Sequence, residues 1–256
     1  MKIKLLGAHS GESKATRLTT LLIDDVLVVD AGGLTSSLSF PAQQKLKAIL
    51  LTHQHYDHIR DVPTIVFNFA NWPLEIDIYS TALVYETLAT HLLNGKVYPQ
   101  LLGWPPEKPR IRFTVIGPYE ARQVAGYTVL AVPVKHSLGT VGYEITSPEG
   151  KVVFYTGDTG PGLDSCWQRV NPQLLITEVS APDRLQEFYQ GRGHLTPGLL
   201  KQELESFRRL KGYLPDVVIV HMTPELEAEI KAEVAGVARD LGHPIVVGDE
   251  GMEFHL

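Results

Sequence analysis

The chain has little cysteine, no long apolar run and no excess of positive charge, and each shortage excludes a class of protein. Cys166 is the single cysteine among 256 residues, which excludes an intramolecular disulfide framework and any zinc site built mainly from thiolates. No run approaches the roughly 18 consecutive apolar residues of a membrane span. The 23 Lys and Arg residues against 29 Asp and Glu give a net charge of −6, so the overall charge attracts neither nucleic acid nor an anionic membrane.

The composition is that of an ordinary folded protein. Hydrophobic residues make up 44% of the chain and charged residues 20%, which excludes wholesale disorder. A length of 256 residues fits one large domain or two small ones. Because no linker or internal repeat interrupts the chain, we expect residues 1–256 to form a single domain. Residues 1–7 turn polar too soon for a signal peptide, so the cytoplasm is the expected compartment.

Strand patterns fill most of the sequence before residue 180. Residues 47–52 form a short, almost continuously apolar run, which is typical of a strand buried on both faces. Other short runs rich in β-branched and apolar residues, bounded by turn residues, also predict strands. These runs are residues 2–5, 19–24, 26–30, 75–79, 112–116, 123–133, 141–146, 151–156, 173–179, 216–221, 244–247 and 252–255.

Apolar residues at helical spacing predict three helices, over residues 83–93, 197–210 and 225–241. Strands followed by helices in each half favour an α/β fold of two sheets with helices outside. A proline-rich segment, residues 95–109, also carries Tyr98 and Trp104. We expect an ordered loop there. The sequence leaves open whether it is a lid beside a site, a surface that stacks on a base, a packed surface loop or a dimer contact.

Ten histidines are present, and several gather directly after the strand at residues 47–52. His53, His55, Asp57 and His58 spell H-x-H-x-D-H, a pattern with a chance of about one in a thousand of arising at random in such a chain. Two residues apart on extended backbone, His53 and His55 point the same way. We expect a helix to begin at Asp57 and His58, so that their side chains point to a different position from those of His53 and His55. Imidazole and carboxylate are ligands that zinc, manganese and iron(II) accept, whereas the alternative is a solvated polar loop.

This motif after a buried strand resembles the signature of the metallo-β-lactamase superfamily of dinuclear metallohydrolases. In that family the remaining ligands are a histidine, a bridging aspartate and a final histidine, each after a later strand. His136, Asp158 and His221 follow predicted strands in that order. The resemblance covers nearly the whole chain. It implies a four-layer αββα sandwich of two mixed β-sheets with helices on the outer faces and metals at one edge.

The resemblance also implies a ligand set. His53, His55 and His136 would bind one divalent ion, and Asp57, His58 and His221 a second, with Asp158 bridging both. Zinc is the first expectation, although manganese and iron(II) suit the same ligands.

Three further residues near these ligands have an expected place in the site. Gly157 and Gly160 leave room for a close approach of backbone to the site. The family often has an aspartate and glycine where Asp30 stands. We expect Asp30 to orient ligand groups by hydrogen bonds, the alternative being an ordinary turn.

A second motif narrows the resemblance. Glu178 at a strand end, followed by G-H-L-T-P at residues 193–197, is similar to tRNA 3′-processing endonucleases and class II cyclic-nucleotide phosphodiesterases. In those groups the histidine contacts the scissile phosphate and protonates the leaving oxygen. The resemblance therefore implies a general acid, His194, oriented by Glu178, with a gain of roughly a hundred- to ten-thousandfold. Alternatively His194 only opens a helix, with Thr196 and Pro197 as its cap and first residue.

Together these motifs favour a dinuclear metal-dependent phosphodiesterase acting on a small phosphodiester such as a cyclic nucleotide. In this interpretation a hydroxide bridging the metals attacks phosphorus, with Asp57, Asp158, His194 and Glu178 as catalytic residues. The alternatives are tRNA 3′ processing, hydrolysis of a lactone or thioester, and a non-catalytic metal-binding module. The acidic charge and the lack of a Lys-rich arm disfavour nucleic acid as a partner. A homodimer is expected only from the family.

Some polar residues stay without a firm role. His9 follows the first predicted strand and either lines the site or is a plain loop residue. Lys135 and Arg192 either offer positive charge to a phosphate or are solvated surface. No role is predicted for the remaining histidines, which are His91, His243 and His255.

Overall fold

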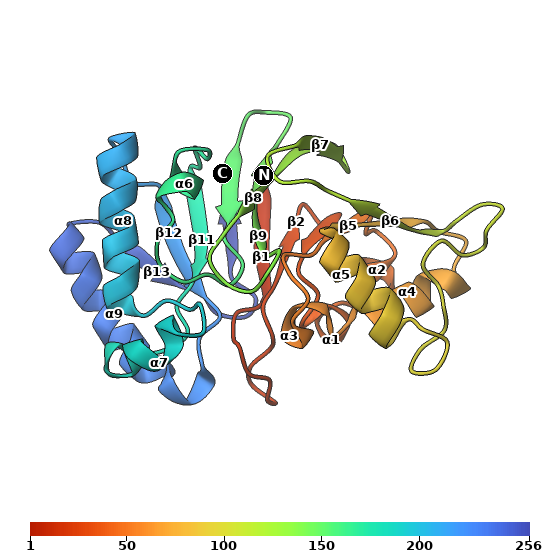
Figure 1. Cartoon of the computed structure of the whole chain (residues 1–256), viewed down its shortest axis with the longest axis horizontal. Coiled ribbons are helices and arrows are strands. Elements are labelled where there is room, and N and C mark those ends of the chain that lie inside the picture. Colours follow the sequence, from red (N-terminus) through yellow and green to blue (C-terminus); the bar gives the residue numbers. More distant parts are fainter.

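Two seven-stranded sheets lie face to face in the computed structural model, which describes residues 1–256 (Figure 1). The first sheet has the order β14-β1-β2-β3-β4-β5-β6 and the second β13-β12-β11-β10-β9-β8-β7. The strands of the first sheet are β1 (Lys2–Gly7), β2 (Thr20–Ile23), β3 (Leu27–Val29), β4 (Ala48–Leu50), β5 (Ile76–Ser80), β6 (Ile111–Val115) and β14 (Glu253–His255). Those of the second are β7 (Ala121–Val124), β8 (Tyr127–Pro133), β9 (Val141–Thr146), β10 (Val152–Tyr155), β11 (Leu174–Glu178), β12 (Asp216–Val220) and β13 (Ile245–Val247).

Helices cover the outer face of each sheet (Figure 1). Those beside the first sheet are α1 (Leu34–Ser37), α2 (Phe40–Gln43), α3 (Tyr56–Ile59), α4 (Val62–Asn71) and α5 (Ala82–Thr87), and those beside the second are α6 (Asp164–Trp167), α7 (Gln186–Gln190), α8 (Pro197–Lys211) and α9 (Glu227–Leu241). No helix combines the length and apolar character needed to cross a membrane. Parallel and antiparallel pairs occur in both sheets. The predicted four-layer αββα sandwich of two mixed sheets is therefore confirmed.

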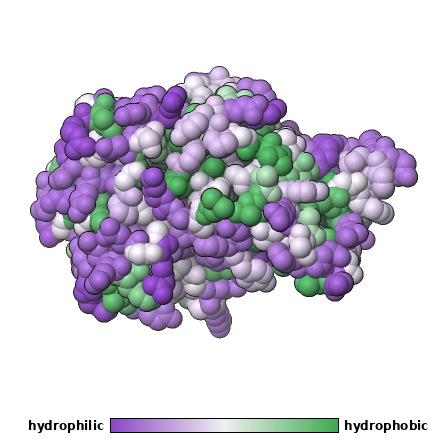
Figure 2. Space-filling view, in the orientation of Figure 1, coloured by the Kyte–Doolittle hydropathy of each residue, from purple (hydrophilic) through white to green (hydrophobic).

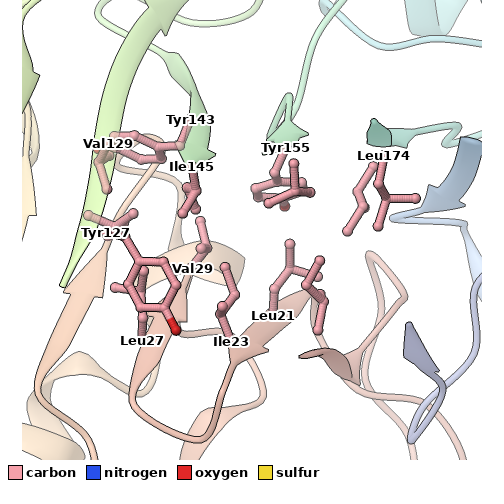
Figure 3. Packing of buried hydrophobic residues seen from close by; sticks show 14 of the residues in the cluster. Leu21, Ile23, Leu27, Val29, Tyr127, Val129, Tyr143, Ile145, Tyr155 and Leu174 are labelled. Carbon is pink, nitrogen blue, oxygen red and sulfur yellow. The ribbon is translucent and has the colours of Figure 1, made fainter. Parts of the chain in front are cut away.

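Alternate residues of the strands fill three separate apolar cores, one at each interface between layers. In β2, Leu21 and Ile23 point between the sheets whereas Leu22 packs under the outer helices. In β11, Ile176 points between the sheets and Leu175 outward. Figure 3 shows side chains of both sheets meeting in the central core. Because successive side chains point to opposite faces and both faces are covered, the strand sequences are almost continuously apolar, as the sequence pattern indicated.

The strand directions gather the polar segments at one edge of the sandwich. In the first sheet β3 runs parallel to β4, and in the second β10, β11 and β12 are parallel. The residues just beyond the carboxyl ends of these strands therefore lie at one edge of their sheet, where open α/β sheets place their sites. Backbone bridges join His9, which continues β1, to Leu18 and to Met222, which follows β12. This bridge links the first sheet to the second beside that edge.

One helix was not predicted, and three predicted elements differ from the structure. Helix α4 was not predicted, although its buried Ile65, Val66 and Phe69 recur at helical spacing; its β-branched residues and Pro63 obscure the pattern. The strand predicted at 123–133 is a hairpin of β7 and β8, because Ala125 and Gly126 both adopt positive φ and turn the chain. The helix predicted at 83–93 is α5 followed by a π-helical turn, Leu88–Leu92. The helix predicted from residue 225 is a 3-10 turn, Pro224–Leu226, followed by α9.

The proline-rich segment, residues 95–109, packs at the end of the first sheet that is remote from the polar edge. The Gly103 N–H donates to the carbonyl of Ile111, and the Arg110 N–H to that of Trp104, at the amino end of β6. Leu101 is buried in the outer core, and the ring of Tyr98 packs against Phe67 of α4. The segment is a packed surface loop, and it is neither a lid over the site nor a base-stacking surface beside it.

Candidate metal centre

All seven side chains predicted as metal ligands lie together at the polar edge. They form two groups that share Asp158, and within each group the potential ligand atoms lie within 4.8 Å of one another. The first group holds His53, His55, His136 and Asp158, and the second holds Asp57, His58, Asp158 and His221. Each group matches the division implied by the sequence motifs.

Asp158 divides its two carboxylate oxygens between the groups. Its Oδ2 lies 3.7 Å from Nε2 of His53 and 3.7 Å from Nε2 of His136. Its Oδ1 lies 3.1 Å from Nε2 of His58 and 3.4 Å from Nε2 of His221. Ligands about 2.1 Å from a tetrahedral ion are roughly 3.4 Å apart. The spacing therefore fits one divalent ion per group with a carboxylate bridge between them.

Unpartnered polar atoms in the centre also fit bound cations. Nε2 of His53, Nε2 of His58 and Oδ1 of Asp158 are buried without a hydrogen-bond partner, an arrangement that normally costs free energy unless a ligand completes it. Burial lowers the pKa of His58, but the carboxylates of Asp158, Asp30 and Asp57 outweigh burial and hold that pKa well above its ordinary value. The second group therefore favours a positive charge at its centre.

The local backbone explains how four ligands come from six consecutive residues. His53 follows β4 by three residues, and His55 is the residue just before α3, in extended conformation. Asp57 and His58 lie in the single turn of α3, as the sequence predicted. Nδ1 of His55 lies 3.0 Å from Nε2 of His136. A change from extended to helical backbone thus turns the first pair toward one group and the second pair toward the other.

Asp30 is completely buried and holds the ligand segment from beneath. It accepts hydrogen bonds from Nδ1 of His58 at 2.7 Å, from the backbone N–H of Thr52 at 2.8 Å and from the hydroxyl of Tyr155 at 3.1 Å. The Thr52 hydroxyl also donates to Asp30, and so it accepts from Nδ1–H of His53 at 3.0 Å. Both imidazoles are thereby fixed with Nε2 free to face a metal. The hydrogen-bonding role predicted for Asp30 is confirmed.

Glu178 joins the predicted acid to the second group. Its Oε1 accepts from Nδ1 of His194 at 2.7 Å, and its Oε2 accepts from the hydroxyl of Ser180 at 2.7 Å. The Ser180 oxygen in turn accepts a hydrogen bond from Nδ1–H of His221 at 3.0 Å. Burial lowers the pKa of His194, but the charge and the hydrogen bond of Glu178 outweigh burial and raise that pKa to about 9. The side chain of His194 is 17% exposed, so Nε2 can meet a substrate.

Comparison with known proteins gives the same family as the motifs. The family model described as "Beta-lactamase superfamily domain" matches residues 19–222. The chain belongs to the metallo-β-lactamase superfamily.

Two solved structures of this fold cover the whole chain. Yeast PDE1 is 16% identical, with a TM-score of 0.85 over 100% of this chain and 99% of that one. The short form of human tRNase Z is 17% identical, with a TM-score of 0.69 over 100% and 99%. A hydroxyacylglutathione hydrolase of Nitrosomonas eutropha is 38% identical over 71 residues, which are 27% of this chain and 26% of that protein. The similarity to this curated relative thus spans about a quarter of its length.

Close backbone packing holds the metallo-β-lactamase site together. Gly193 has a φ of +77°, and a Cβ there would lie 2.9 Å from Cα of His136, whose Nδ1 donates to the Gly193 carbonyl at 2.9 Å. Gly157 has a φ of +61°, and a Cβ there would lie 2.9 Å from Cβ of Thr52. The close approach predicted at Gly157 is present. Any side chain at these two glycines would displace a ligand or its support.

Several residues considered from sequence lie elsewhere or act differently. His9 is buried and bound through Nδ1 to Glu250 at 2.8 Å, so it neither lines the site nor is a plain loop residue. The guanidinium of Arg192 lies over the ring of Phe188, 3.5 Å from its centroid. Thr196 precedes α8 as predicted, but its hydroxyl caps nothing. Instead Asp183 accepts the Gly198 N–H at 2.7 Å.

Sequence reasoning missed the hydroxyl groups that connect the charged residues. Thr52 and Ser180 each contact a candidate ligand, and Tyr155 supports Asp30, yet serine, threonine and tyrosine are common and carry no spacing signal of their own. The signal that the sequence offered was the closeness of a hydroxyl residue to a motif residue along the chain. Thr52 directly precedes the first motif histidine, and Ser180 stands two residues after Glu178.

We expect Asp30→Asn to weaken metal binding by about 10- to 100-fold. An amide cannot accept from His58 with the strength of a carboxylate, and its NH2 group must face one of the donors that now surround Asp30. The measurement is a competitive zinc titration against a chelator. Asp61→Asn is the control, because Asp61 is buried and accepts a backbone N–H but touches no ligand. Equal zinc affinity for wild type and a folded Asp30→Asn protein would contradict the role.

Ser180→Ala is expected to lower the affinity of the second group by about tenfold while leaving the first group unchanged. His221 loses the acceptor that fixes its Nδ1 proton, whereas no residue of the first group contacts Ser180 through a hydrogen bond. Metal content after dialysis, measured by mass spectrometry, should fall below that of wild type. Ser147→Ala, a buried serine in the turn after β9, should retain the wild-type content. A Ser180→Ala protein with full content would overturn this connection.

Proposed function

We propose that the protein is a metal-dependent phosphodiesterase that hydrolyses a small phosphodiester, with cyclic nucleotides as the first substrates to test. The observation that supports this proposal is the hydrogen bond between Nδ1 of His194 and Oε1 of Glu178, 2.7 Å long. This pair lies beside the two ligand groups. His194 stacks on His221 with ring centroids 5.7 Å apart and lies 4.8 Å from the ring of His136. A protonated imidazole at this place suits a substrate whose leaving oxygen needs a proton.

The two groups described above are the proposed holders of two divalent ions, with zinc as the first choice. When bound, such ions polarise phosphoryl oxygens and lower the pKa of water toward neutrality. The donor set suits zinc, manganese and iron(II), because it consists of imidazole and carboxylate without thiolate. Cys166, the single thiol, belongs to α6 and is buried in the core there, so it offers no ligand.

The residues of the chain supply proton transfer and orientation. His194 donates Nδ1–H to Glu178 and so keeps its second proton on Nε2, facing outward. In hydrolysis water forms a new P–O bond and releases a proton, the P–O bond to the alcohol breaks, and the departing oxygen takes the Nε2 proton. The proton that water releases restores the imidazolium through the solvent. Glu178 stabilises the imidazolium before transfer and holds its orientation. Its bonds to Ser180 and to the Thr159 N–H at 3.0 Å keep the carboxylate fixed.

One observation favours a second candidate, hydrolysis of a thioester. The name of the curated relative, hydroxyacylglutathione hydrolase, describes an acylglutathione substrate, and 71 residues align with it at 38% identity. A thiolate leaves without prior protonation far more readily than an alkoxide. In that reaction the proton held by His194 gives little advantage, so the pair with Glu178 favours the phosphodiester.

An activity screen on the metal-reconstituted protein tests the proposal. The panel holds 3′,5′-cyclic nucleotides, bis(p-nitrophenyl) phosphate, an acylglutathione, a lactone and a tRNA precursor, each with zinc, manganese or iron(II). We expect turnover of the first two substrates above the others. Preferred cleavage of the tRNA precursor or of the acylglutathione would replace the proposal with that activity. No turnover by a fully metallated sample would point to a non-catalytic metal-binding protein.

A further inference from the structure

An apolar cavity of about 460 Å³ lies beside the metal centre and has no part in the chemistry described so far. It is formed by the loop after β8, the beginning of α5 and the end of β6. Leu83, Ile116, Val134 and Leu138 are among its apolar lining residues. Figure 2 shows apolar surface near the middle of the molecule, where these elements meet. Leu138, one of these lining residues, is 84% exposed.

The cavity is continuous with the ligand segment. Its lining residue Ser137 directly follows His136, and the Ser137 hydroxyl accepts from Nε2 of Gln54 at 3.2 Å. Gln54 stands between the ligand candidates His53 and His55. The N–H of the lining residue Val141 donates to the carbonyl of Thr52 at 3.1 Å. The loop that lines the cavity therefore also carries His136, and it is hydrogen-bonded to the segment that carries His53 and His55.

The lining chemistry selects an uncharged occupant. None of the lining residues is Lys, Arg, Asp or Glu, so the cavity offers no partner for a phosphate or for a second charge. Its few polar lining residues are Thr81, Ser137 and Thr140, which carry hydroxyl groups. Apolar walls with a few polar groups are typical of small-molecule pockets, and the volume lies in their usual range of about 300–1,000 Å³.

We propose that this cavity holds an uncharged aromatic substituent of the phosphodiester, while the phosphate lies at the metal centre. A ring with apolar faces and a polar edge, such as a nucleobase, fits apolar walls that carry only a few hydroxyl residues. The inference rests on the proposed function and narrows its substrate to phosphodiesters that carry such a ring. It also disfavours a polyanionic strand, for which the cavity provides no cation.

The kinetic test varies the substituent and keeps the leaving group constant. The substrates are the methyl, phenyl and thymidine 5′ esters of p-nitrophenyl phosphate. We expect kcat/KM for the phenyl and thymidine esters to exceed that for the methyl ester by at least about tenfold. Leu138→Ser removes an apolar wall and Ala82→Trp fills the cavity, and either should reduce this preference by about tenfold. Both positions are exposed, so folding is preserved.

A binding measurement separates the cavity from the activity. Calorimetry compares phenylphosphonate with methylphosphonate on the metal-loaded protein, for wild type, Leu138→Ser and the control Leu210→Ser, an exposed leucine on α8. We expect wild type and Leu210→Ser to prefer phenylphosphonate and Leu138→Ser to lose the preference. That result without any turnover would support the cavity and reject the phosphodiesterase. Equal binding of both phosphonates by wild type, or equal effects of the two leucine variants, would overturn the cavity assignment.

Discussion

Asp158→Ala should abolish hydrolysis, with a loss of roughly a thousandfold or more in kcat/KM, because it removes the one side chain common to both ligand groups. Several kcal/mol of charge stabilisation depend on two correctly placed ions. Loss of the bridge also removes one of the carboxylates that the imidazoles of His58 and His221 face. Metal content should fall from two ions per chain to one or fewer.

The controls for this variant separate chemistry from folding. Asp158→Asn preserves the buried shape and should still lose most activity, since an amide supplies a single oxygen and cannot bridge two ions. Asp240→Ala, an exposed aspartate on α9 paired with Lys201, should behave like wild type. Activity is assayed on bis(p-nitrophenyl) phosphate and folding by circular dichroism. Full activity in Asp158→Ala would rule out the dinuclear assignment.

His194→Ala should reduce cleavage of an alkyl phosphodiester by about a hundred- to ten-thousandfold while affecting a p-nitrophenyl ester far less. An alkoxide needs a proton as it leaves, whereas p-nitrophenolate leaves without one. Comparison of kcat on the two substrates measures the difference. His243→Ala is a matched control, because His243 is bound to the Pro215 carbonyl and lies outside the site. Equal losses of activity on both substrates would show that His194 has only a structural role.

The same histidine sets the direction of the pH dependence. Its pKa of about 9 means that the acid form dominates at neutral pH and is lost as pH rises through that value. Cations bound at the two neighbouring groups lower the pKa in the loaded protein, so the decline begins below pH 9. Alkyl ester cleavage should therefore fall on the alkaline side in wild type. In His194→Ala this limb of the kcat profile should disappear.

The ligand residues could be found from sequence because they follow strands whose burial is unmistakable. Runs such as residues 48–51 and 174–176 are apolar at every position, since both faces are covered in a four-layer sandwich. Polar residues directly after such runs stand out. Asp30 was found from the resemblance to the family, which often has an aspartate and glycine at the end of this strand.

Other features could not be predicted, for identifiable physical reasons. The role of Ser180 depends on three hydrogen-bond partners that come together only in the folded chain. Helix α4 buries five residues of a ten-residue span, among them Pro63 and several β-branched residues, which resembles a strand in sequence. The place of the proline-rich segment depends on the direction in which β6 runs within its sheet. Because β6 is parallel to β5, its amino end lies away from the polar edge. No local pattern encodes the direction of a strand within a sheet.

With these ligands, bound metal ions would link the two sheets to each other. His53, His55, Asp57 and His58 belong to the segment after β4 in the first sheet, whereas His136, Asp158 and His221 follow strands of the second. Bound metal would then stabilise the folded protein to a degree that depends on the concentration of free ion. It would add about 4 kcal/mol to the unfolding free energy when free ion exceeds its Kd a thousandfold. The melting temperature of this protein thus becomes a readout of metal supply, and a chelator should lower it without changing a single covalent bond.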